Sequence, residues 1–167
     1  MKKIETERKY VILKPDMTLI AGEEGFSESK ITQIYLLDRE VTHRIRKREY
    51  PEKTEYTENT KRRISYMSAI ESEAEISRER FDELSAEIDP NTKPIEKNRV
   101  TFLYNGRVFE IDIYPAWKDT CILEVELDSE AGKILFPSFI KVVRDVTGMR
   151  EYSNHSMAYE FPAELKP

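Results

Sequence analysis

Alternation of polar and apolar residues with a period of two recurs along the whole chain, and it restricts the fold more than any other feature. Such alternation is typical of β-strands, because successive side chains of a strand point to opposite faces of a sheet. It predicts strands at 4–13, 31–37, 41–48, 54–61, 69–76, 96–104, 107–114 and 121–127. No linker, repeat or low-complexity run interrupts this series. We therefore predict one domain over residues 1–167, made mostly of antiparallel strands.

Helical spacing occurs in two segments, which we expect at the periphery of the sheet. One helix begins at the capping residue Ser77 and ends before Pro90, and its apolar side consists of Phe81, Leu84 and Ile88. The other is predicted over 129–146, with a kink or a restart at Pro137. A tight hairpin is expected at 105–106, since Asn-Gly accepts the positive φ of such a turn. The fold class is thus mostly β, of the α+β type.

Composition excludes several classes of protein. Charged residues make up 35% of the chain and the net charge is −5, but 9 Tyr and 7 Phe indicate a folded core. An acidic total argues against broad nucleic-acid binding. No run of about 18 apolar residues exists to cross a membrane, and the N-terminal residues lack the apolar region of a secretory signal. A single cysteine, Cys121, fits a reducing compartment, so we expect a cytoplasmic protein.

Charged residues occupy one face of nearly every predicted strand, at positions i and i+2. The acidic members are Glu5, Glu7, Glu71, Glu73, Glu110, Asp112, Glu124 and Glu126. The basic members are Lys9, Arg44, Arg46, Lys61, Lys97 and Arg99. One interpretation is that these faces are simply solvated and the apolar faces form an ordinary core. The other is that eight strands close into a barrel with the charged faces inside, which leaves room for one small ligand.

A charged lumen would bind ions of both signs. Buried carboxylates and guanidinium groups must be paired or must bind a ligand. Two histidines and one cysteine do not make a usual zinc site, so any metal would be a hard cation held by carboxylates. Arginine and lysine side chains would then be available for an anion with several phosphates. The residues therefore indicate metal-dependent phosphate chemistry inside a barrel.

An ordered series of motifs also resembles the CYTH, or triphosphate tunnel metalloenzyme, superfamily. The series begins with Glu5-x-Glu7-x-Lys9 and extends over about 150 residues. Its later members, in the order of the family, are Gln33-Ile34-Tyr35-Leu36, Arg44-Ile45-Arg46, Thr60-Lys61, Glu71-Ser72-Glu73, Lys97-Asn98-Arg99, Phe109-Glu110-Ile111-Asp112, Leu123-Glu124-Val125-Glu126-Leu127, Asp145-Val146-Thr147-Gly148 and Tyr152-Ser153-Asn154. One such motif would be weak, but the ordered series is specific.

The resemblance implies an eight-stranded antiparallel tunnel that binds a triphosphate together with Mg²⁺ or Mn²⁺. The metal ligands it implies are Glu5, Glu7, Asp112, Glu124 and Glu126. The substrate-binding bases it implies are Lys9, Arg44, Arg46, Lys61, Lys97, Arg99 and Arg150. Tyr35, Glu7 and Lys97 are the implied catalytic residues, although Tyr35 could equally be a tyrosine packed in the wall.

Some residues depart from the family pattern. Ala69 stands where relatives commonly carry an arginine, two residues before the middle acidic pair. Thr60 and Lys61 are adjacent, without an intervening residue, so Arg63 is an alternative for the tunnel position of Lys61. The aromatic and histidine residues that precede the acidic signature in bacterial cyclases are absent here. This last departure disfavours a cyclase.

The leading hypothesis is metal-dependent hydrolysis of inorganic triphosphate or of a nucleoside triphosphate. Adenylyl cyclase or thiamine triphosphatase activity is the alternative within the family, and a non-catalytic polyphosphate- or nucleotide-binding module is the alternative outside catalysis. The predicted partner is a small-molecule triphosphate or nucleotide, with no nucleic acid and no membrane, and a homodimer is left open. Arg48 is expected at a strand end and of lesser importance, and Glu160 and Glu164 are expected on a solvated surface.

Overall fold

Antiparallel strands make up most of the computed structural model, which describes residues 2–167; Met1, the first residue of the predicted domain, lies outside it. The strands are β1 (Lys2–Leu13), β2 (Ser27–Leu36), β3 (Thr42–Glu49), β4 (Thr54–Arg63), β5 (Ser68–Glu75), β6 (Ile95–Tyr104), β7 (Arg107–Ile113), β8 (Thr120–Glu126) and β9 (Val142–Asp145). The eight predicted strands correspond to β1–β8, and β9 was not predicted. Among the described residues, no helix has the length and apolar character needed to cross a bilayer.

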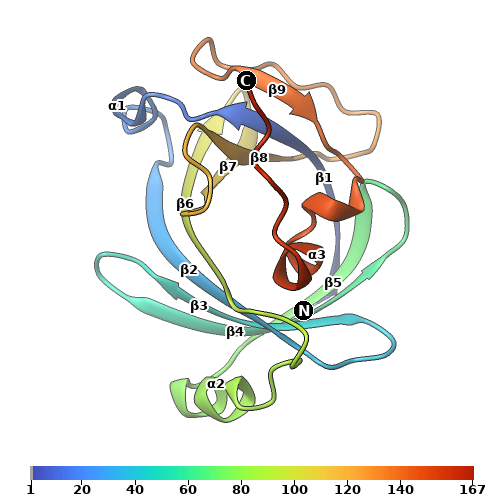
Figure 1. The fold of residues 1–167 in the computed structure, drawn as a ribbon. Helices are drawn as coiled ribbons and strands as arrows, with labels where there is room; N and C mark the ends of the chain where they lie inside the picture. The colour runs from blue at the N-terminus through green and yellow to red at the C-terminus, as the bar shows by residue number, and fades with distance from the viewer. Residues whose placement is uncertain (1) are drawn as a thin grey trace.

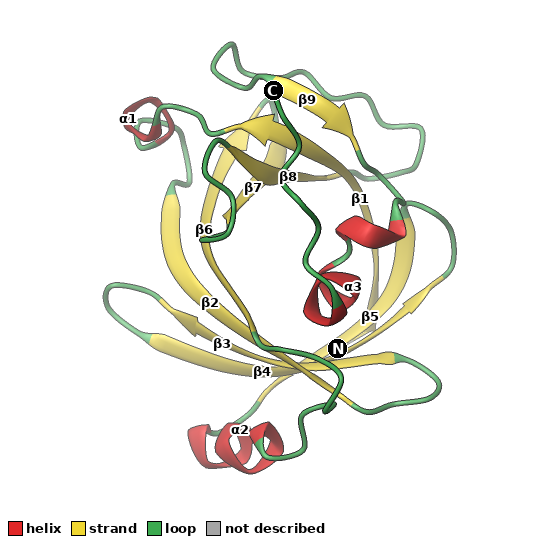
Figure 2. Cartoon of the chain, in the orientation of Figure 1, coloured by secondary structure: helices red, strands yellow, loops and turns green. Residues whose placement is uncertain are grey.

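The sheet closes on itself through β1. Its strand order is β5-β4-β3-β2-β6-β7-β8-β1, and β9 pairs with the second half of β1 on the edge opposite β8. The first half of β1 pairs with β5, from Lys2 opposite Ser72 to Thr6 opposite Ser68. The second half pairs with β8, from Glu7 opposite Glu126 to Leu13 opposite Thr120. Closure therefore confirms the predicted eight-stranded antiparallel barrel, and Figure 2 shows the strands as a ring.

The register directs the apolar faces of the strands outward. Alternate residues of β6, β7 and β8 form the outer core, which includes Phe102, Phe109, Ile111, Leu123 and Val125. All five side chains are fully buried, although they lie outside the barrel. The charged residues between them therefore face the interior. This arrangement confirms the second of the two interpretations of the charged faces.

An irregular segment, and not a helix, covers this outer core. The predicted helix over 129–146 is wrong: 127–141 is loop and turn, and the chain then forms β9. Its apolar residues Ile134, Phe136, Phe139 and Ile140 dock on the outer core, together with Ile20 of the short helix α1 (Met17–Ile20). Gly132 forms a turn with Ser129, and Pro137 has no N–H to give to a helix. Docking on the barrel wall therefore outweighs the weak helical pattern.

Helix α2 (Arg78–Ser85) confirms the first helix that was predicted. Ser77 caps it, because its side chain accepts a hydrogen bond from the backbone N–H of Arg80. Phe81 and Leu84 pack on the outer face of β2 and β3, where they meet Ile34, Leu36 and Ile45. Figure 1 shows α2 outside the ring of strands.

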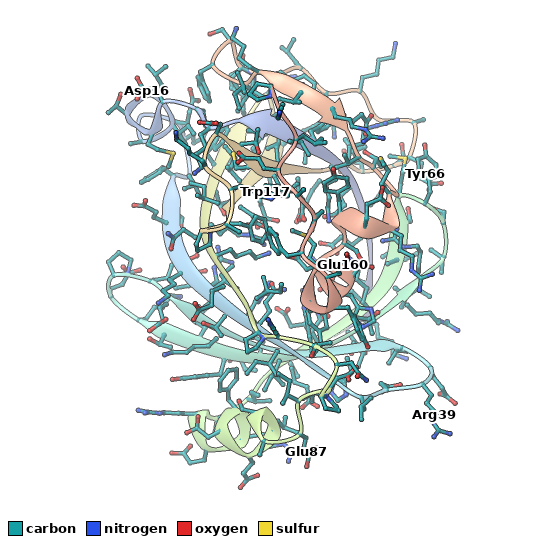
Figure 3. All side chains as sticks on the ribbon, in the orientation of Figure 1. Asp16, Arg39, Tyr66, Glu87, Trp117 and Glu160 are labelled. Atoms are coloured by element: carbon teal, nitrogen blue, oxygen red, sulfur yellow. The ribbon has the colours of Figure 1, made fainter. Side chains whose placement is uncertain are left out.

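The C-terminal segment closes one end of the barrel. It contains a 3₁₀ turn, η1 (Arg150–Tyr152), and helix α3 (Asn154–Tyr159), neither of which was predicted. In Figure 1, α3 lies within the outline of the ring, and the chain after it runs back along the barrel. Met157 and Ala158 of α3 pack with Tyr35, Tyr114 and Trp117. The indole N–H of Trp117 donates to the carbonyl of Pro162, 3.0 Å away, in the segment after α3 (Figure 3).

Glu164 lies at the surface, where it was expected, but its carboxylate binds the backbone of another segment. Its carboxylate accepts hydrogen bonds from the backbone N–H groups of Lys118, Asp119 and Thr120 at 2.6–2.9 Å. Although partial burial opposes it, this cluster of donors lowers the pKa of Glu164 to about 2. Glu160, by contrast, is exposed. Glu164 thus joins the segment after α3 to residues 118–120, in addition to the hydrogen bond from Trp117.

We expect Glu164→Ala to lower the melting temperature by at least about 3 °C at pH 7, whereas Glu160→Ala should leave it within about 1 °C. Because folding lowers the pKa of Glu164 from 4.5 to about 2, its stabilisation is complete above pH 4.5 and is lost as the pH falls toward 2. The difference between wild type and Glu164→Ala, measured by thermal unfolding, should therefore shrink below pH 4.5. Equal melting temperatures for the two variants at pH 7 would contradict this role.

Candidate active site

A cavity of about 710 Å³ fills the interior of the barrel. The predicted site residues that line it are Glu5, Glu7, Lys9, Tyr35, Arg44, Arg46, Lys61, Arg99, Glu124, Glu126 and Arg150. Lys97 and Asp112 are not among the lining residues. Figure 3 shows side chains projecting from the strands into the ring. The cavity therefore brings together most of the residues that sequence motifs selected, from six strands and from the C-terminal segment.

Carboxylates gather where β1 meets β8. Glu7 and Glu126 are directly opposite each other in this strand pair, and Lys9 is opposite Glu124. Lys9 forms an ion pair with Glu124 at 3.2 Å between Nζ and Oε1. No such ion pair is found for Glu7 or for Glu126 among residues 2–167. Two facing carboxylates are therefore left without a basic side chain in direct contact.

The pKa values of these acids differ because their neighbours differ. Burial, and then the charge of Glu124, raise the pKa of Glu7 to about 8. Burial and the nearby Glu110 also raise the pKa of Glu126. Burial would likewise raise the pKa of Glu124, but Lys9 and Arg99 outweigh it and lower that pKa to about 2. Glu124 is thus compensated by bases, whereas Glu7 and Glu126 are ionised only at a cost.

Arginines line the opposite wall, on strand β3. Arg44 lies 3.5 Å from Glu71, and Arg46 lies 3.2 Å from Glu73, measured between Nη2 and the nearer carboxylate oxygen. Burial, followed by the charges of Arg44 and Arg99, lowers the pKa of Arg46 to about 10. A guanidinium is harder to charge here because other cations crowd it. This wall therefore carries an excess of positive charge.

Asn59 of β4 is a site residue that the motif analysis missed. Its amide donates to Glu71 at 2.5 Å and to Glu73 at 3.4 Å. It shares its strand face with Lys61, because the two are separated by one residue, and Arg63 also lines the cavity. The sequence left open whether Lys61 or Arg63 points into the barrel. Both line the cavity, because they lie on the same face of β4. Counting two residues back from Lys61 would have selected Asn59.

Lys97 and Asp112 lie in a buried ion cluster in the barrel wall. Asp112, which is only 1% exposed, accepts from Lys97 at 2.7 Å and from Arg99 at 2.7 and 2.8 Å. Both bases hold the pKa of Asp112 well below its usual range, against the effect of burial. Burial lowers the pKa of Lys97 to about 8. Both oxygens of Asp112 therefore already accept hydrogen bonds from bases, which disfavours its predicted role as a metal ligand.

Tyr35 and the C-terminal segment form the closed end of the cavity. The Tyr35 hydroxyl accepts a hydrogen bond from Gln33 Nε2 at 3.2 Å, and the side chain is almost fully buried. The ring of His155, from α3, lies 5.1 Å from the Tyr35 ring between centroids. Burial lowers the pKa of His155, which therefore favours its neutral form. His155 was not predicted, although it follows directly after the quoted Tyr152-Ser153-Asn154.

The donor set suits a hard divalent cation. Within residues 2–167, no three His, Cys, Asp or Glu side chains are already grouped as a metal site. However, the carboxylates of Glu7 and Glu126 lie opposite each other without a direct basic partner, and burial together with other nearby acids raises the pKa of both. A cation held between carboxylates removes both penalties, and Mg²⁺ and Mn²⁺ prefer such oxygen ligands. The residues present therefore fit the metal that the family resemblance implies.

We expect Glu7→Gln to stabilise the metal-free protein at alkaline pH. Because the pKa of Glu7 rises from 4.5 to about 8 on folding, its contribution to stability is intact below pH 4.5 and is lost as the pH rises through 8. Gln keeps the shape but cannot ionise, so the melting temperature of Glu7→Gln in EDTA should exceed that of wild type by several degrees at pH 8.5 and match it near pH 4.5.

The exposed Glu87 provides the control for this prediction, because Glu87→Gln should change neither temperature. Addition of Mn²⁺ should stabilise the wild type more than Glu7→Gln. A lower melting temperature for Glu7→Gln at pH 8.5 would show that ionised Glu7 is already compensated in the metal-free protein.

Solved structures with the same fold cover most of this chain. The inorganic triphosphatase NE1496 matches with a TM-score of 0.60 at 25% sequence identity, over 95% of this chain and 97% of that one. PH1819 from Pyrococcus horikoshii OT3 matches with a TM-score of 0.56 at 18% identity, over 76% and 80% of the two chains. A conserved hypothetical protein from Pyrococcus furiosus matches at 0.54 and 18%, also over 76% and 80%.

At 18% identity, the two Pyrococcus structures establish a common fold only. No protein-family model and no curated protein matches the chain. The match to NE1496 extends over nearly the full length of both chains. These structural neighbours are consistent with the CYTH, or triphosphate tunnel metalloenzyme, superfamily, which the ordered sequence motifs resemble.

Proposed function

We propose that this protein hydrolyses a triphosphate with the help of Mg²⁺ or Mn²⁺ inside the barrel. The observation that carries the proposal is that one cavity holds two facing carboxylates without direct basic partners and, on the other wall, a row of arginines. A polyphosphate with a bound divalent cation has the matching distribution of charge. The NE1496 protein, which has this fold at 25% identity, is an inorganic triphosphatase. This supports inorganic triphosphate as the first substrate to test.

The phosphate groups would be held by the basic wall. Arg44 and Arg46 are at i and i+2 on β3, so both reach the same side of the cavity. Their planar guanidinium groups bind phosphate oxygens through two parallel hydrogen bonds. Lys61, Lys9 and Arg150 would add charge from other directions, since each lines the same cavity.

The metal would be held by the carboxylates of β1 and β8. We assign Glu7 and Glu126 as its principal ligands, with Glu5 and Glu124 at their sides. When bound, the cation would neutralise negative charge that develops on the transferred phosphoryl group. Asp112 is omitted from this set because Lys97 and Arg99 already occupy both of its oxygens.

Tyr35 and Glu7 remain the candidates for orienting the attacking water. The Tyr35 oxygen accepts from Gln33, so its own proton is available for donation to a ligand in the cavity. Glu7 has a carboxylate whose pKa of about 8 suits proton transfer near neutral pH. Lys97 was predicted to be catalytic, but we assign it a different role. It donates to Asp112, and Asp112 accepts from Arg99. Lys97 would therefore position Arg99, a substrate-binding base, without touching the substrate.

The proposal also includes a cellular location and a set of alternative activities. Cys121 is fully buried and, among the described residues, is the one thiol, so a reducing compartment such as the cytoplasm remains the expected location. Cyclase, thiamine triphosphatase and non-catalytic binding are the outcomes against which hydrolysis must be tested.

The test of the proposal is phosphate release from triphosphate, pyrophosphate, ATP and thiamine triphosphate, each with Mg²⁺, with Mn²⁺ and with EDTA. We expect release from inorganic triphosphate that requires a divalent cation. Glu126→Gln removes a ligand charge without changing shape, so it should reduce this rate by at least about 100-fold. Glu28→Gln, on the exposed outer face of β2, should not. Tight binding without release from any of the four would favour the binding module.

Substrate affinity tests the basic wall separately from the metal. Arg46→Lys keeps the charge but loses the planar fork, so it should weaken triphosphate binding by about 10-fold. Arg46→Ala should weaken binding further, because it also leaves Glu73 without this partner charge. Calorimetric titration in EDTA measures both without turnover. Unchanged affinity in Arg46→Ala would exclude Arg46 from the phosphate site.

A further inference from the structure

A third arginine of β3, Arg48, also lines the cavity. We expected it at the end of its strand, where the chain leaves the sheet. The structure instead extends β3 to Glu49 and pairs Arg48 with Ile31 of β2 and with Glu55 of β4. Arg44, Arg46 and Arg48 therefore present three cations along one strand face.

Arg48 is held in place by neutral groups. Its Nε donates to the hydroxyl of Ser29 at 2.8 Å, and its guanidinium carbon lies 4.9 Å from the centre of the Tyr50 ring. Ser29 is itself buried, with 5% of its surface exposed. Both contacts orient the guanidinium without neutralising it, and they leave its two terminal nitrogens available.

Most of the other bases that line the cavity have acidic partners in contact, although Lys3, Arg63 and Arg150 have no ion pair among the described residues. Arg44 and Arg46 lie beside Glu71 and Glu73, and Lys9 and Lys61 are paired with carboxylates of β8 and β1. Within residues 2–167, no ion pair to Arg48 is found. Arg48 is therefore an oriented cation in the cavity whose charge is not balanced by a carboxylate in contact. Arg48 is only half-buried, so water can solvate its free nitrogens, and an anion that enters the cavity can take the place of that water.

The position of Arg48 relative to the closed end of the barrel gives the direction of the bound chain. Its partner Ser29 and the closed-end residue Tyr35 are six residues apart on β2, which corresponds to about 20 Å along the strand. Helix α3 lies against Tyr35 through His155. A phosphate chain bound by Arg44 and Arg46 can therefore continue toward Arg48, away from α3.

We propose that Arg48 and Ser29 form a further phosphate subsite, which binds the fourth phosphoryl group of a linear inorganic phosphate chain. This rests on the proposed triphosphate function and extends it, because it assigns a preference for chains longer than three phosphates. Arg48 supplies the charge and Ser29 keeps its guanidinium turned into the cavity. A chain with only two or three phosphates ends before it reaches this subsite.

Calorimetric titration of pyrophosphate, triphosphate and tetraphosphate in EDTA tests the subsite. We expect the wild type to bind tetraphosphate at least about 10-fold more tightly than triphosphate. Arg48→Met keeps the aliphatic stem beside Tyr50 but removes the charge, so it should reduce this ratio to about 1. Ser29→Ala should reduce the same ratio part of the way, because Arg48 remains but is less well oriented.

Lys47→Ala is the matched control on the same strand, since Lys47 lies on the opposite face and pairs with Glu49. It should leave the ratio unchanged. The subsite is overturned if Arg48→Met and Ser29→Ala retain the wild-type ratio, or if they weaken all three ligands equally. A wild type that binds triphosphate but shows no preference for tetraphosphate overturns the subsite alone. A wild type that binds none of the three overturns the proposed function and the subsite together.

Discussion

The interior of this barrel contains carboxylate and guanidinium groups at positions where a small closed barrel could hold apolar side chains. Charge is costly away from water, so each of these groups must find a partner. The cluster of Lys97, Asp112 and Arg99 shows the fully paired case, in which Asp112 accepts from both bases. Removing one member of such a buried pair typically costs about 3–5 kcal/mol, because the other charge remains. Pairing of this kind makes the charged lumen compatible with a stable fold.

Incomplete pairing elsewhere in the same lumen gives the cavity its chemical character. Glu7 ionises only with difficulty, and Arg46 is crowded by other cations. Arg48 is oriented by a hydroxyl and an aromatic ring instead of an acid. A cation near Glu7 and an anion near the arginines would each relieve one of these unfavourable interactions. The lumen therefore offers separate places for a cation and for an anion, as the proposed metal-assisted phosphoryl transfer would require.

Local alternation was sufficient to predict the barrel, because a period of two assigns every residue of a strand to one face. It predicted all eight barrel strands and the inward direction of residues such as Glu124. The helical spacing over 129–146 led to a wrong prediction, because the shape of that segment is set by docking on Phe109 and its neighbours. The sequence analysis also missed Asn59, which contacts Glu71 on the neighbouring strand β5, and His155, which contacts Tyr35 from helix α3. Single residues could be assigned to the lumen, but their partners depend on register and closure.

The central claim is that the lumen has an acidic wall for a metal ion and a basic wall for a triphosphate. The most direct test is whether the two ligands stabilise the protein cooperatively. The melting temperature would be measured with Mn²⁺ alone, with a non-hydrolysable triphosphate analogue alone, and with both. If the two ions neutralise opposite walls of one cavity, the increase with both should exceed the sum of the two separate increases. An increase with both that is no larger than that of the better single ligand would contradict the account, because the acidic and basic walls would then not act on one bound complex.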